Sequence, residues 1–386
     1  MPSLDISNNS KSESKSKNNN SKSNKQQLGQ FFTTNYKYIL RNMHIPKKTK
    51  KIIEPFAGNG DLVNFVTDKS IPIQYYDIDP KKDYITKRDT LKNPPDYKNK
   101  FILTNPPYLA RNKNKDKSIY NTYQENDLYK CFLKSILTSQ CTGGIIIIPL
   151  NFWCSIRKKD IQLRKSFLQV FTVLAINIFE EQVFQDTSYT TCCFQFNRKI
   201  VKKIQGETKE KGDKKKKEDS NSSSNASSKI KCYIYPSKKK LDILLNDKNN
   251  YTIGGEIYQL PINKNIKVER ATSSNQKNKE VTNILVKCLD DSIDNQIALS
   301  IVSKKDRYID TSSAKSARSY ATLVITPKIT KEREKALVQE FNTFLKKERD
   351  KYHSLFLTNY RESNSIARKR ISFKLVFQIV NYLLSK

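Results

Sequence analysis

The sequence predicts an α/β protein, with helices on both faces of a mostly parallel sheet, followed by a C-terminal α+β region. In the first half of the chain, short apolar runs alternate with segments that have the apolar spacing of helices, such as 127–137. The run 145–150 is apolar without alternation, which is typical of a strand buried on both faces. Further on, 297–302 and 320–325 read as strands, and a helical pattern follows from Lys331. These observations predict a two-part fold.

The segment 51–61 is the first predicted element, a short strand followed by a tight glycine turn and the start of a helix. Gly58 and Gly60 let the backbone approach a ligand closely, because glycine has no side chain. A glycine pair of this kind is a weak signal by itself, since any turn between a strand and a helix can carry one.

Three more predicted strands end in polar residues. Asp77 ends the second strand about 20 residues after the glycine turn, where an acid in such a sheet reaches ribose hydroxyls. Asp89 closes the third strand-like unit and Asn105 ends the fourth. Because the carboxyl ends of parallel strands share one edge of the sheet, these strand ends predict a single ligand crevice.

The tetrapeptide at 105–108 carries the chemistry. The side-chain oxygen of Asn105 and the carbonyl of Pro106 can both accept hydrogen bonds, and the two prolines remove two backbone donors. The Tyr108 ring offers a flat face on which a heterocycle can stack. An adenine amino nitrogen is a poor nucleophile, and two acceptors pulling on its hydrogens would localise its lone pair towards an electrophile. The motif therefore predicts a site for a planar amine, with an ordinary Pro-Pro turn as the alternative.

The last two strands of the first sheet are predicted at 170–179 and 189–196, as an antiparallel pair that closes the sheet. On this prediction, a fragment ending near Lys199 contains the whole sheet and folds by itself.

Taken together, these motifs resemble those of the S-adenosylmethionine-dependent DNA N6-adenine methyltransferases of restriction-modification systems, in the gamma-class motif order. The resemblance covers about residues 28–197. Residues 28–34 resemble the family's N-terminal cofactor motif, although Thr34 stands where Pro is usual. The segment 183–191 resembles the one whose Phe stacks on the far face of an extruded base, which is Phe184 here, with a plain core Phe as the alternative.

The resemblance implies a Rossmann-like methyltransferase sheet, S-adenosylmethionine as cofactor and no resident metal. It implies a catalytic set made of Asn105, Pro106, Tyr108 and Phe184. It implies cofactor contacts from the glycine turn and the strand ends: Phe32, Thr33, Glu54, Pro55, Ala57, Gly58, Gly60, Asp77, Asp89 and Asn105. An adenine inside a duplex cannot reach such a site, so the nucleotide would have to be extruded.

Composition fits a polyanionic partner. The 386 residues carry 71 Lys and Arg against 38 Asp and Glu, a formal charge of +33, although a lysine-rich coding bias explains part of that excess. The seven cysteines form no Cys-x-x-Cys spacing and there are two histidines, so we expect buried, reduced thiols and no zinc site. We find no signal peptide and no apolar run of the ~18 residues that span a bilayer, and therefore expect a cytoplasmic protein without membrane contact.

Four stretches are expected. Residues 1–27 form a disordered tail, 28–201 the catalytic domain, 202–229 a Lys- and Ser-rich linker, and 230–386 a DNA target-recognition domain. The candidate DNA-binding residues are Lys304, Lys305, Arg307 and Arg318. The implied partner is double-stranded DNA, with a cognate restriction endonuclease acting on the same site and the chain monomeric during catalysis.

Other functions fit parts of this pattern. The tetrapeptide also serves enzymes that methylate a glutamine amide of release factors, although those usually carry a small N-terminal helical domain and end near the catalytic sheet. RNA adenine methylation and a non-catalytic DNA-binding descendant of a methyltransferase remain open. Cytosine N4 methylation is disfavoured, because those enzymes usually place Ser where Asn105 stands.

Overall fold

A computed structural model describes residues 33–184, 189–200, 227–277, 280–292, 296–311, 319–360 and 368–386. The predicted N-terminal tail, Phe32, Arg318 and most of the predicted linker lie outside the described residues. In the described part of the chain, no helix is long and apolar enough to cross a membrane.

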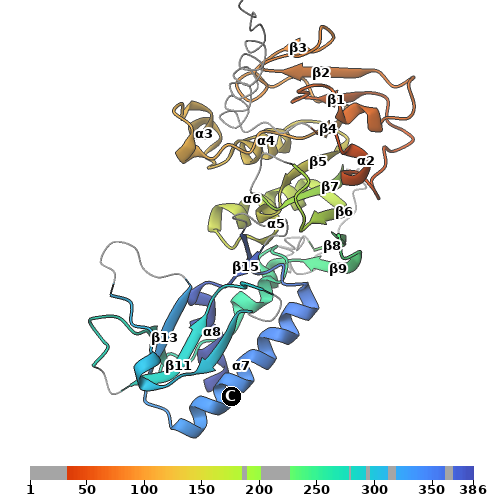
Figure 1. The fold of residues 1–386 in the computed structure, drawn as a ribbon. Coiled ribbons are helices and arrows are strands. Elements are labelled where there is room, and N and C mark those ends of the chain that lie inside the picture. The colour runs from red at the N-terminus through yellow and green to blue at the C-terminus, as the bar shows by residue number, and fades with distance from the viewer. Residues whose placement is uncertain are drawn as a thin grey trace, which may run out of the picture.

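The first sheet has nine strands in the order β3-β2-β1-β4-β5-β7-β6-β8-β9 (Figure 1). The strands are β1 (Ile52–Glu54), β2 (Ile73–Asp77), β3 (Thr86–Lys87), β4 (Phe101–Thr104), β5 (Gly143–Pro149), β6 (Phe171–Phe179), β7 (Thr191–Arg198), β8 (Ser228–Tyr235) and β9 (Lys239–Leu245). Strands β1 to β5 pair in parallel, and β7 lies antiparallel between β5 and β6. The predicted parallel sheet and its antiparallel strand pair are both confirmed.

Helices cover both faces of this sheet. The helices are α2 (Tyr36–Ile39), α3 (Ser118–Tyr123), α4 (Leu128–Leu137), α5 (Asn151–Cys154) and α6 (Lys158–Val170), with a 3-10 turn η1 (Leu62–Phe65). Side chains of β5 alternate between the two faces: Ile146 and Ile148 pack with α4 and α6, and Ile145 and Ile147 with α2 and η1. The apolar run is therefore buried on both sides, as predicted.

The helix expected after the glycine turn is only the 3-10 turn η1. Asp68 accepts hydrogen bonds from the backbone N–H of Ser70 at 3.0 Å and from its hydroxyl at 2.6 Å. Val66 is already extended, so the helix ends before this local turn, in which the Asp68 side chain satisfies backbone groups outside a helix.

The first sheet does not close at β6. Strand β8 pairs in parallel with β6, and β9 pairs antiparallel with β8. The expectation that β6 and β7 close the sheet is therefore wrong, because residues 228–245 extend it by two strands. The predicted linker end at 229 and recognition-domain start at 230 fall inside β8.

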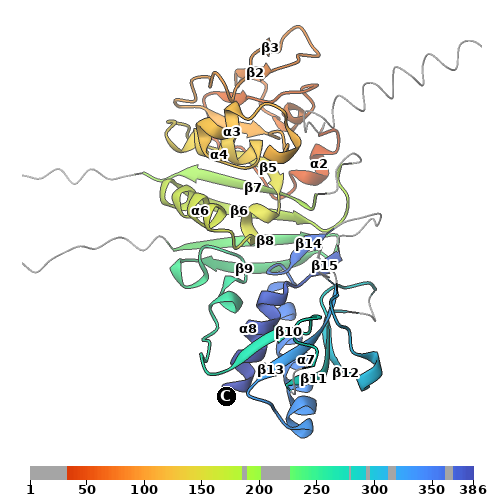
Figure 2. The same cartoon turned by 90° about the vertical axis from the view of Figure 1, so that its left-hand side faces the viewer.

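A second, antiparallel sheet lies in the C-terminal part, in the order β10-β13-β11-β12 (Figure 2). Its strands are β10 (Lys267–Arg270), β11 (Val281–Lys287), β12 (Ala298–Ile301) and β13 (Tyr320–Thr326). Helices α7 (Lys331–Tyr352) and α8 (Phe373–Leu384) pack against it, and β14 (Thr358–Tyr360) pairs with β15 (Arg368–Arg370). The predicted C-terminal strands and helices are confirmed.

Arg164 of α6 joins the sheet to the segment after β9. Its fully buried guanidinium donates to the carbonyls of Tyr251 (2.7 Å), Ser155 (2.6 Å) and Phe152, and to the Thr252 hydroxyl (2.6 Å). Burial lowers the pKa of Arg164 to about 10, although Asp160 opposes that change. One hydrophobic core runs from α4 and β5 through this junction to α7 and α8.

Glu180, at the end of β6, makes a second junction. Its carboxylate contacts Lys369 Nζ of β15 at 2.6 Å and His353 Nε2, after α7, at 2.9 Å. Burial raises the Glu180 pKa, but the His353 hydrogen bond and the Lys369 ammonium outweigh burial and lower that pKa to about 2. The contacts of Glu180 with Lys369 and His353 therefore connect the C-terminal elements to the first sheet.

We expect Glu180→Gln to lower the free energy of unfolding by ~2–3 kcal/mol at pH 7, because it removes the negative charge that pairs with the buried Lys369 ammonium. Since the folded-state pKa is lowered, the stabilisation is complete above the unfolded value of ~4.5 and is lost as the pH falls towards about 2. Denaturant unfolding at pH 7 and pH 3 measures both effects. Asp350→Asn is the control, because its exposed pair with Lys346 contributes little. A Glu180→Gln cost no larger than that of the control would contradict this account.

The seven cysteines are all buried and free, as predicted. Burial is the first cause that raises the pKa of Cys131 and Cys154 to about 12. These thiols are therefore core residues, which fits their lack of ligand spacing.

Candidate active site

The glycine turn after β1 is held in place by Asp77, the last residue of β2. One carboxylate oxygen of Asp77 accepts from the Gly58 N–H at 2.8 Å, and the other accepts from the Asp79 N–H at 2.8 Å. Gly58 and Gly60 adopt φ values of 55° and 75°, a region that favours glycine. Asp77 thus fixes the backbone on which the cavity is built, in addition to lining that cavity.

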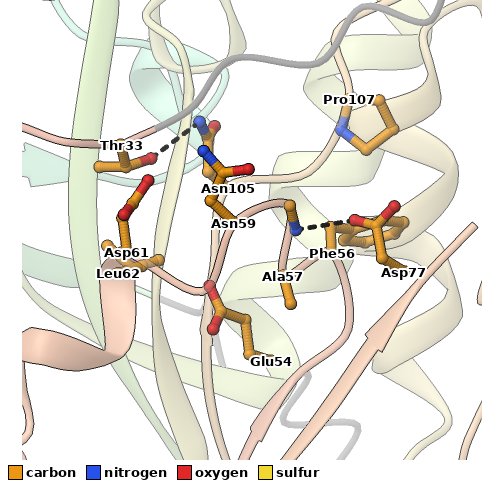
Figure 3. A pocket seen from close by; sticks show the side chains of 11 residues that line it. Thr33, Glu54, Phe56, Ala57, Asn59, Asp61, Leu62, Asp77, Asn105 and Pro107 are labelled. Carbon is orange, nitrogen blue, oxygen red and sulfur yellow. Dashed lines mark hydrogen bonds between the residues drawn. The ribbon is translucent and has the colours of Figure 1, made fainter. Parts of the chain in front are cut away.

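A cavity of about 430 Å³ opens at the carboxyl ends of β1, β2 and β4 (Figure 3). Its lining comes from the turn, from β2 and from the residues after β4: Thr33, Glu54, Phe56, Ala57, Gly58, Asn59, Asp61, Leu62, Asp77, Asn105 and Pro107. Three strand ends predicted from the sequence to share one edge therefore meet in one site.

The cavity holds three carboxylates and no Lys or Arg among its described lining residues. Burial, and then the negative charges of Asp61 and Asp77, raise the pKa of Glu54 well above its usual range. Glu54 Oε2 and Asp61 Oδ2 are buried without a hydrogen-bond partner among the described residues. Buried acceptors of this kind are costly unless a donor or cation meets them, so this end of the site suits a positively charged ligand.

A second cavity of about 810 Å³ adjoins the first, and the two share Phe56, Asp77 and Pro107. Its other lining residues are Ile78, Arg88, Asp89, Thr90, Leu91, Leu109, Asn114, Asp116, Ile119 and Leu128. Ile78 is 45% exposed although it is apolar, because it forms part of this open wall. Apolar walls with the two predicted acids Asp77 and Asp89 suit a flat heterocycle that offers a hydrogen-bond donor.

Asn105 lies between two hydroxyl groups at the first cavity. Its Nδ2 donates to Thr33 Oγ1 at 3.2 Å, and its Oδ1 accepts from the Tyr108 hydroxyl at 2.6 Å. Figure 3 shows the Asn105 amide nitrogen directed at Thr33 and Pro107 on the same side of the cavity as Asp77. Asn105, which we predict to bind the target amine, and Thr33, which we predict to contact the cofactor, are therefore hydrogen-bonded to each other.

The Tyr108 ring departs from the sequence expectation. Only 1% of the residue is exposed, and the ring packs edge-on against Tyr129 and Tyr189 at centroid distances of 6.2 and 6.0 Å. Tyr108 lines neither cavity. The ring face expected to stack on a base is therefore covered in this structure, because the apolar packing of α4 and the segment before β7 encloses it. Only its hydroxyl reaches the site.

Of the other predicted site residues, some belong to the glycine turn and one lies in the hydrophobic core. Pro55 and Gly60 belong to the turn, and the Pro55 carbonyl accepts from the Thr90 hydroxyl at 3.0 Å. Phe184 is buried in the core cluster on the α2 face, in agreement with the alternative reading of this residue. Its role at a base stays a prediction.

Three of the predicted DNA-binding residues are described by the structure, and they follow β12 on the connection to β13. Lys304 and Lys305 are exposed in the 3-10 turn η5 (Lys304–Asp306). Arg307 instead donates to Asn283 Oδ1 at 2.9 and 3.1 Å and to the Val281 carbonyl at 3.1 Å, so its guanidinium braces β11. That internal role lowers its availability to a phosphate or base.

Sequence reasoning missed several lining residues, above all Asp61, Ile78 and Pro107. Asp61 follows Gly60 directly and Ile78 follows Asp77, so adjacency to the assigned residues was an available signal. Among the described residues, no group of three or more His, Cys, Asp or Glu is arranged to hold a metal ion.

The chain was compared with protein-family models, with curated proteins and with solved structures. A family model described as N-6 DNA Methylase matches residues 70–277. A search of curated proteins finds no match.

Solved structures resemble parts of the chain. One is a modification subunit of a type I restriction enzyme from Vibrio vulnificus (16% identity, 50% of this chain, 51% of that chain, TM-score 0.36). Another is a type I restriction-modification methyltransferase subunit from Streptococcus thermophilus (12% identity, 53% of this chain, 48% of that chain, TM-score 0.33). A third is a class I S-adenosylmethionine-dependent methyltransferase from Listeria monocytogenes (13% identity, 40% of this chain, 56% of that chain, TM-score 0.32). The chain spans about half the length of each.

The matched range 70–277 is more than half of the 386 residues, and it contains Asp77, Asp89 and the tetrapeptide that begins at Asn105. The chain therefore belongs to the N-6 DNA methylase family.

Proposed function

We propose that this chain transfers a methyl group from S-adenosylmethionine to the N6 amino group of an adenine extruded from double-stranded DNA. The observation that carries this proposal is the position of Asn105. The residue directly follows β4 and lines a cavity that also holds Glu54 and Asp61, each of which has a buried oxygen without a hydrogen-bond partner among the described residues. A hydrogen-bond acceptor for an amine and a binding site for a cation are thus adjacent.

The residues present fit S-adenosylmethionine, which when bound supplies a methyl group on a positively charged sulfur. The unpartnered oxygens of Glu54 and Asp61 would hold its ammonium group and favour the nearby positive charge. Asp77, shared by both cavities, would accept from ribose hydroxyls. Asp89 and the apolar walls formed by Ile78 and Phe56 would hold the adenine of the cofactor.

The chain's part in the reaction is positioning and desolvation. Asn105 Oδ1 and the Pro106 carbonyl accept the two hydrogens of the target amine, which directs the nitrogen lone pair towards the methyl group. The amine would take the methyl group while the bonding pair of the S–C bond stays on sulfur, which becomes a neutral thioether, and the methylated amine would then release one proton to solvent. No general base therefore has to be within reach beforehand. Holding two reactants in line can itself raise the rate by several powers of ten.

We further propose that the C-terminal part binds DNA, with exposed Lys304 and Lys305 as candidates for phosphate contacts. Phosphate contacts release counterions, so DNA affinity should fall steeply with salt. The restriction endonuclease partner, the monomeric state and the cytoplasmic location stay predictions.

The function is tested by incubating the full-length protein and labelled S-adenosylmethionine with duplex DNA, structured RNA and a translation release factor side by side. We expect label in duplex DNA, on N6 of adenine after digestion to nucleosides. Label only in RNA or only in the release factor would replace the proposal with the corresponding alternative. No label in any of the three would favour a non-catalytic DNA-binding protein.

Asp77→Ala tests the cofactor site. We expect its affinity for S-adenosylmethionine to fall by about 10- to 100-fold, because the turn loses its charge-assisted hydrogen bond at Gly58, the Asp79 N–H loses its acceptor, and the ribose loses its acceptor as well. Isothermal calorimetry measures the affinity, and Asp83→Ala, which removes an exposed carboxylate nearby, is the control. An unchanged affinity would move the ribose contact to Asp79.

A further inference from the structure

A hydrogen-bonded chain of three side chains runs through the catalytic amide. Thr33 Oγ1 accepts from Asn105 Nδ2 at 3.2 Å, and the Tyr108 hydroxyl donates to Asn105 Oδ1 at 2.6 Å. The Tyr108 hydroxyl also lies 3.2 Å from the Ile147 carbonyl of β5. Asn105 and Tyr108 belong to the tetrapeptide after β4, whereas Thr33 lies before α2 and Ile147 in β5, so three separate segments of the chain meet around one amide.

The two distances indicate which way the amide faces. An O–H···O bond is typically ~2.7–2.8 Å long and an N–H···O bond ~2.9–3.0 Å. The short contact to Tyr108 therefore fits the amide oxygen, and the longer contact to Thr33 fits the amide nitrogen. A flipped amide would present its N–H2 group to the incoming amine, which also offers hydrogens, and the two donors would repel each other.

The surroundings of the Thr33 and Tyr108 hydroxyls fix their positions. Thr33 is 5% exposed, and the Tyr108 ring is fixed by the edges of Tyr129 and Tyr189. Burial is the first cause that raises the pKa of Tyr108 above its usual range, so its hydroxyl keeps the proton that it donates. The donor on one side and the acceptor on the other both favour this orientation of the amide.

We propose that Thr33 and Tyr108 are positioning residues, whose hydroxyls hold the Asn105 amide with its oxygen towards the target amine. The inference rests on the proposed methyl transfer and deepens it. Tyr108 contributes its hydroxyl to this arrangement, and an amide oxygen can accept more than one hydrogen bond, so that the target amine can bind there too. Thr33 accepts the amide N–H on the wall of the cofactor cavity and so holds the nitrogen end of the amide there. Thr33 and Asn105 both line this cavity.

Tyr108→Phe and Thr33→Val remove the two hydroxyls with little change of shape. We expect kcat for adenine methylation to fall by about 10- to 100-fold in each, as a small misplacement of a reacting group can cost. Tyr108→Phe should leave the Kd for S-adenosylmethionine within about 2-fold, because Tyr108 lines neither cavity. Thr33→Ser should restore most of the rate lost in Thr33→Val.

The chain offers matched controls. Tyr97 and Thr104 each carry a buried hydroxyl that has no hydrogen-bond partner among the described residues. Tyr97→Phe and Thr104→Val therefore remove the same groups without breaking a bond, and kcat should stay within about 2-fold of wild type. A double variant supplies a further readout: adding Tyr108→Phe to Asn105→Ala should cause no further loss of kcat, because the group that Tyr108 orients is gone.

The side-chain amide of Asn105 gives a readout independent of activity. Its NMR signal, identified by its absence in Asn105→Ala, should lose protection against hydrogen exchange in Tyr108→Phe and Thr33→Val and keep it in the controls. A wild-type enzyme that methylates adenine while Tyr108→Phe matches Tyr97→Phe in kcat and in amide protection overturns the positioning role alone. A wild-type protein that methylates no adenine overturns the proposed function and this inference together.

Discussion

Asn105→Ala is expected to lower the rate of methyl transfer by about 10²–10³, while the affinity for S-adenosylmethionine stays within about 3-fold of wild type. The substitution removes the side-chain acceptor for the target amine, and one lost transition-state hydrogen bond of this kind usually costs that much. The carboxylates Glu54 and Asp61, which would hold the cofactor, come from other parts of the chain and remain.

Single-turnover methylation and calorimetry measure the two quantities separately. Asn112→Ala is the matched control, since it removes an exposed amide seven residues further along and outside both cavities. An Asn105→Ala variant that keeps more than about a tenth of the wild-type rate would mean that Asn105 is not the acceptor for the amine.

A fragment ending at Lys199 is expected not to fold, and this is the second large effect. The cut removes β8 and β9, so β6 becomes an exposed edge with unpaired backbone groups. It also removes Tyr251 and Thr252, which satisfy the buried Arg164 guanidinium. A buried charge without partners costs several kcal/mol, a large part of the stability of a typical domain.

Circular dichroism and denaturant unfolding of the fragment test this expectation. The control deletes residues 206–224 from the full-length chain. Strands β7 and β8 flank β6, so Arg198 and Ser228 lie at the same end of the sheet about 10 Å apart, a gap that the remaining residues can span. A soluble fragment that unfolds cooperatively would show that β8 and β9 are accessory to the sheet.

The sequence was most informative where chemistry restricts the residue type. Asp77 and Asn105 stand at strand ends, and parallel pairing of β1, β2 and β4 brings strand ends to one edge regardless of side-chain detail. Their meeting in one cavity could therefore be predicted. The β5 run could be predicted as well, because a short run of β-branched residues between Gly144 and Pro149 favours a strand covered on both faces.

Long-range packing was not predictable in the same way. Strand β8 alternates apolar and polar residues like many strands, and nothing local in that pattern identifies β6 as its partner. The burial of Tyr108 depends on Tyr129 and Tyr189, which are distant in sequence. The internal role of Arg307 depends likewise on Asn283. In each case the contact that decides the role of the residue comes from elsewhere in the chain. The Tyr108 ring, suited to stacking on a base, packs in the core, and the Arg307 guanidinium, suited to binding phosphate, makes hydrogen bonds inside the protein.

The most direct test of the central claim is sequencing that detects N6-methyladenine in DNA from a methylation-free host. One culture expresses the full-length protein and a second expresses Asn105→Ala at the same level. The account predicts N6-methyladenine at a defined short site in the first culture and at background level in the second. DNA without N6-methyladenine in the first culture, or equal methylation in both, would contradict it.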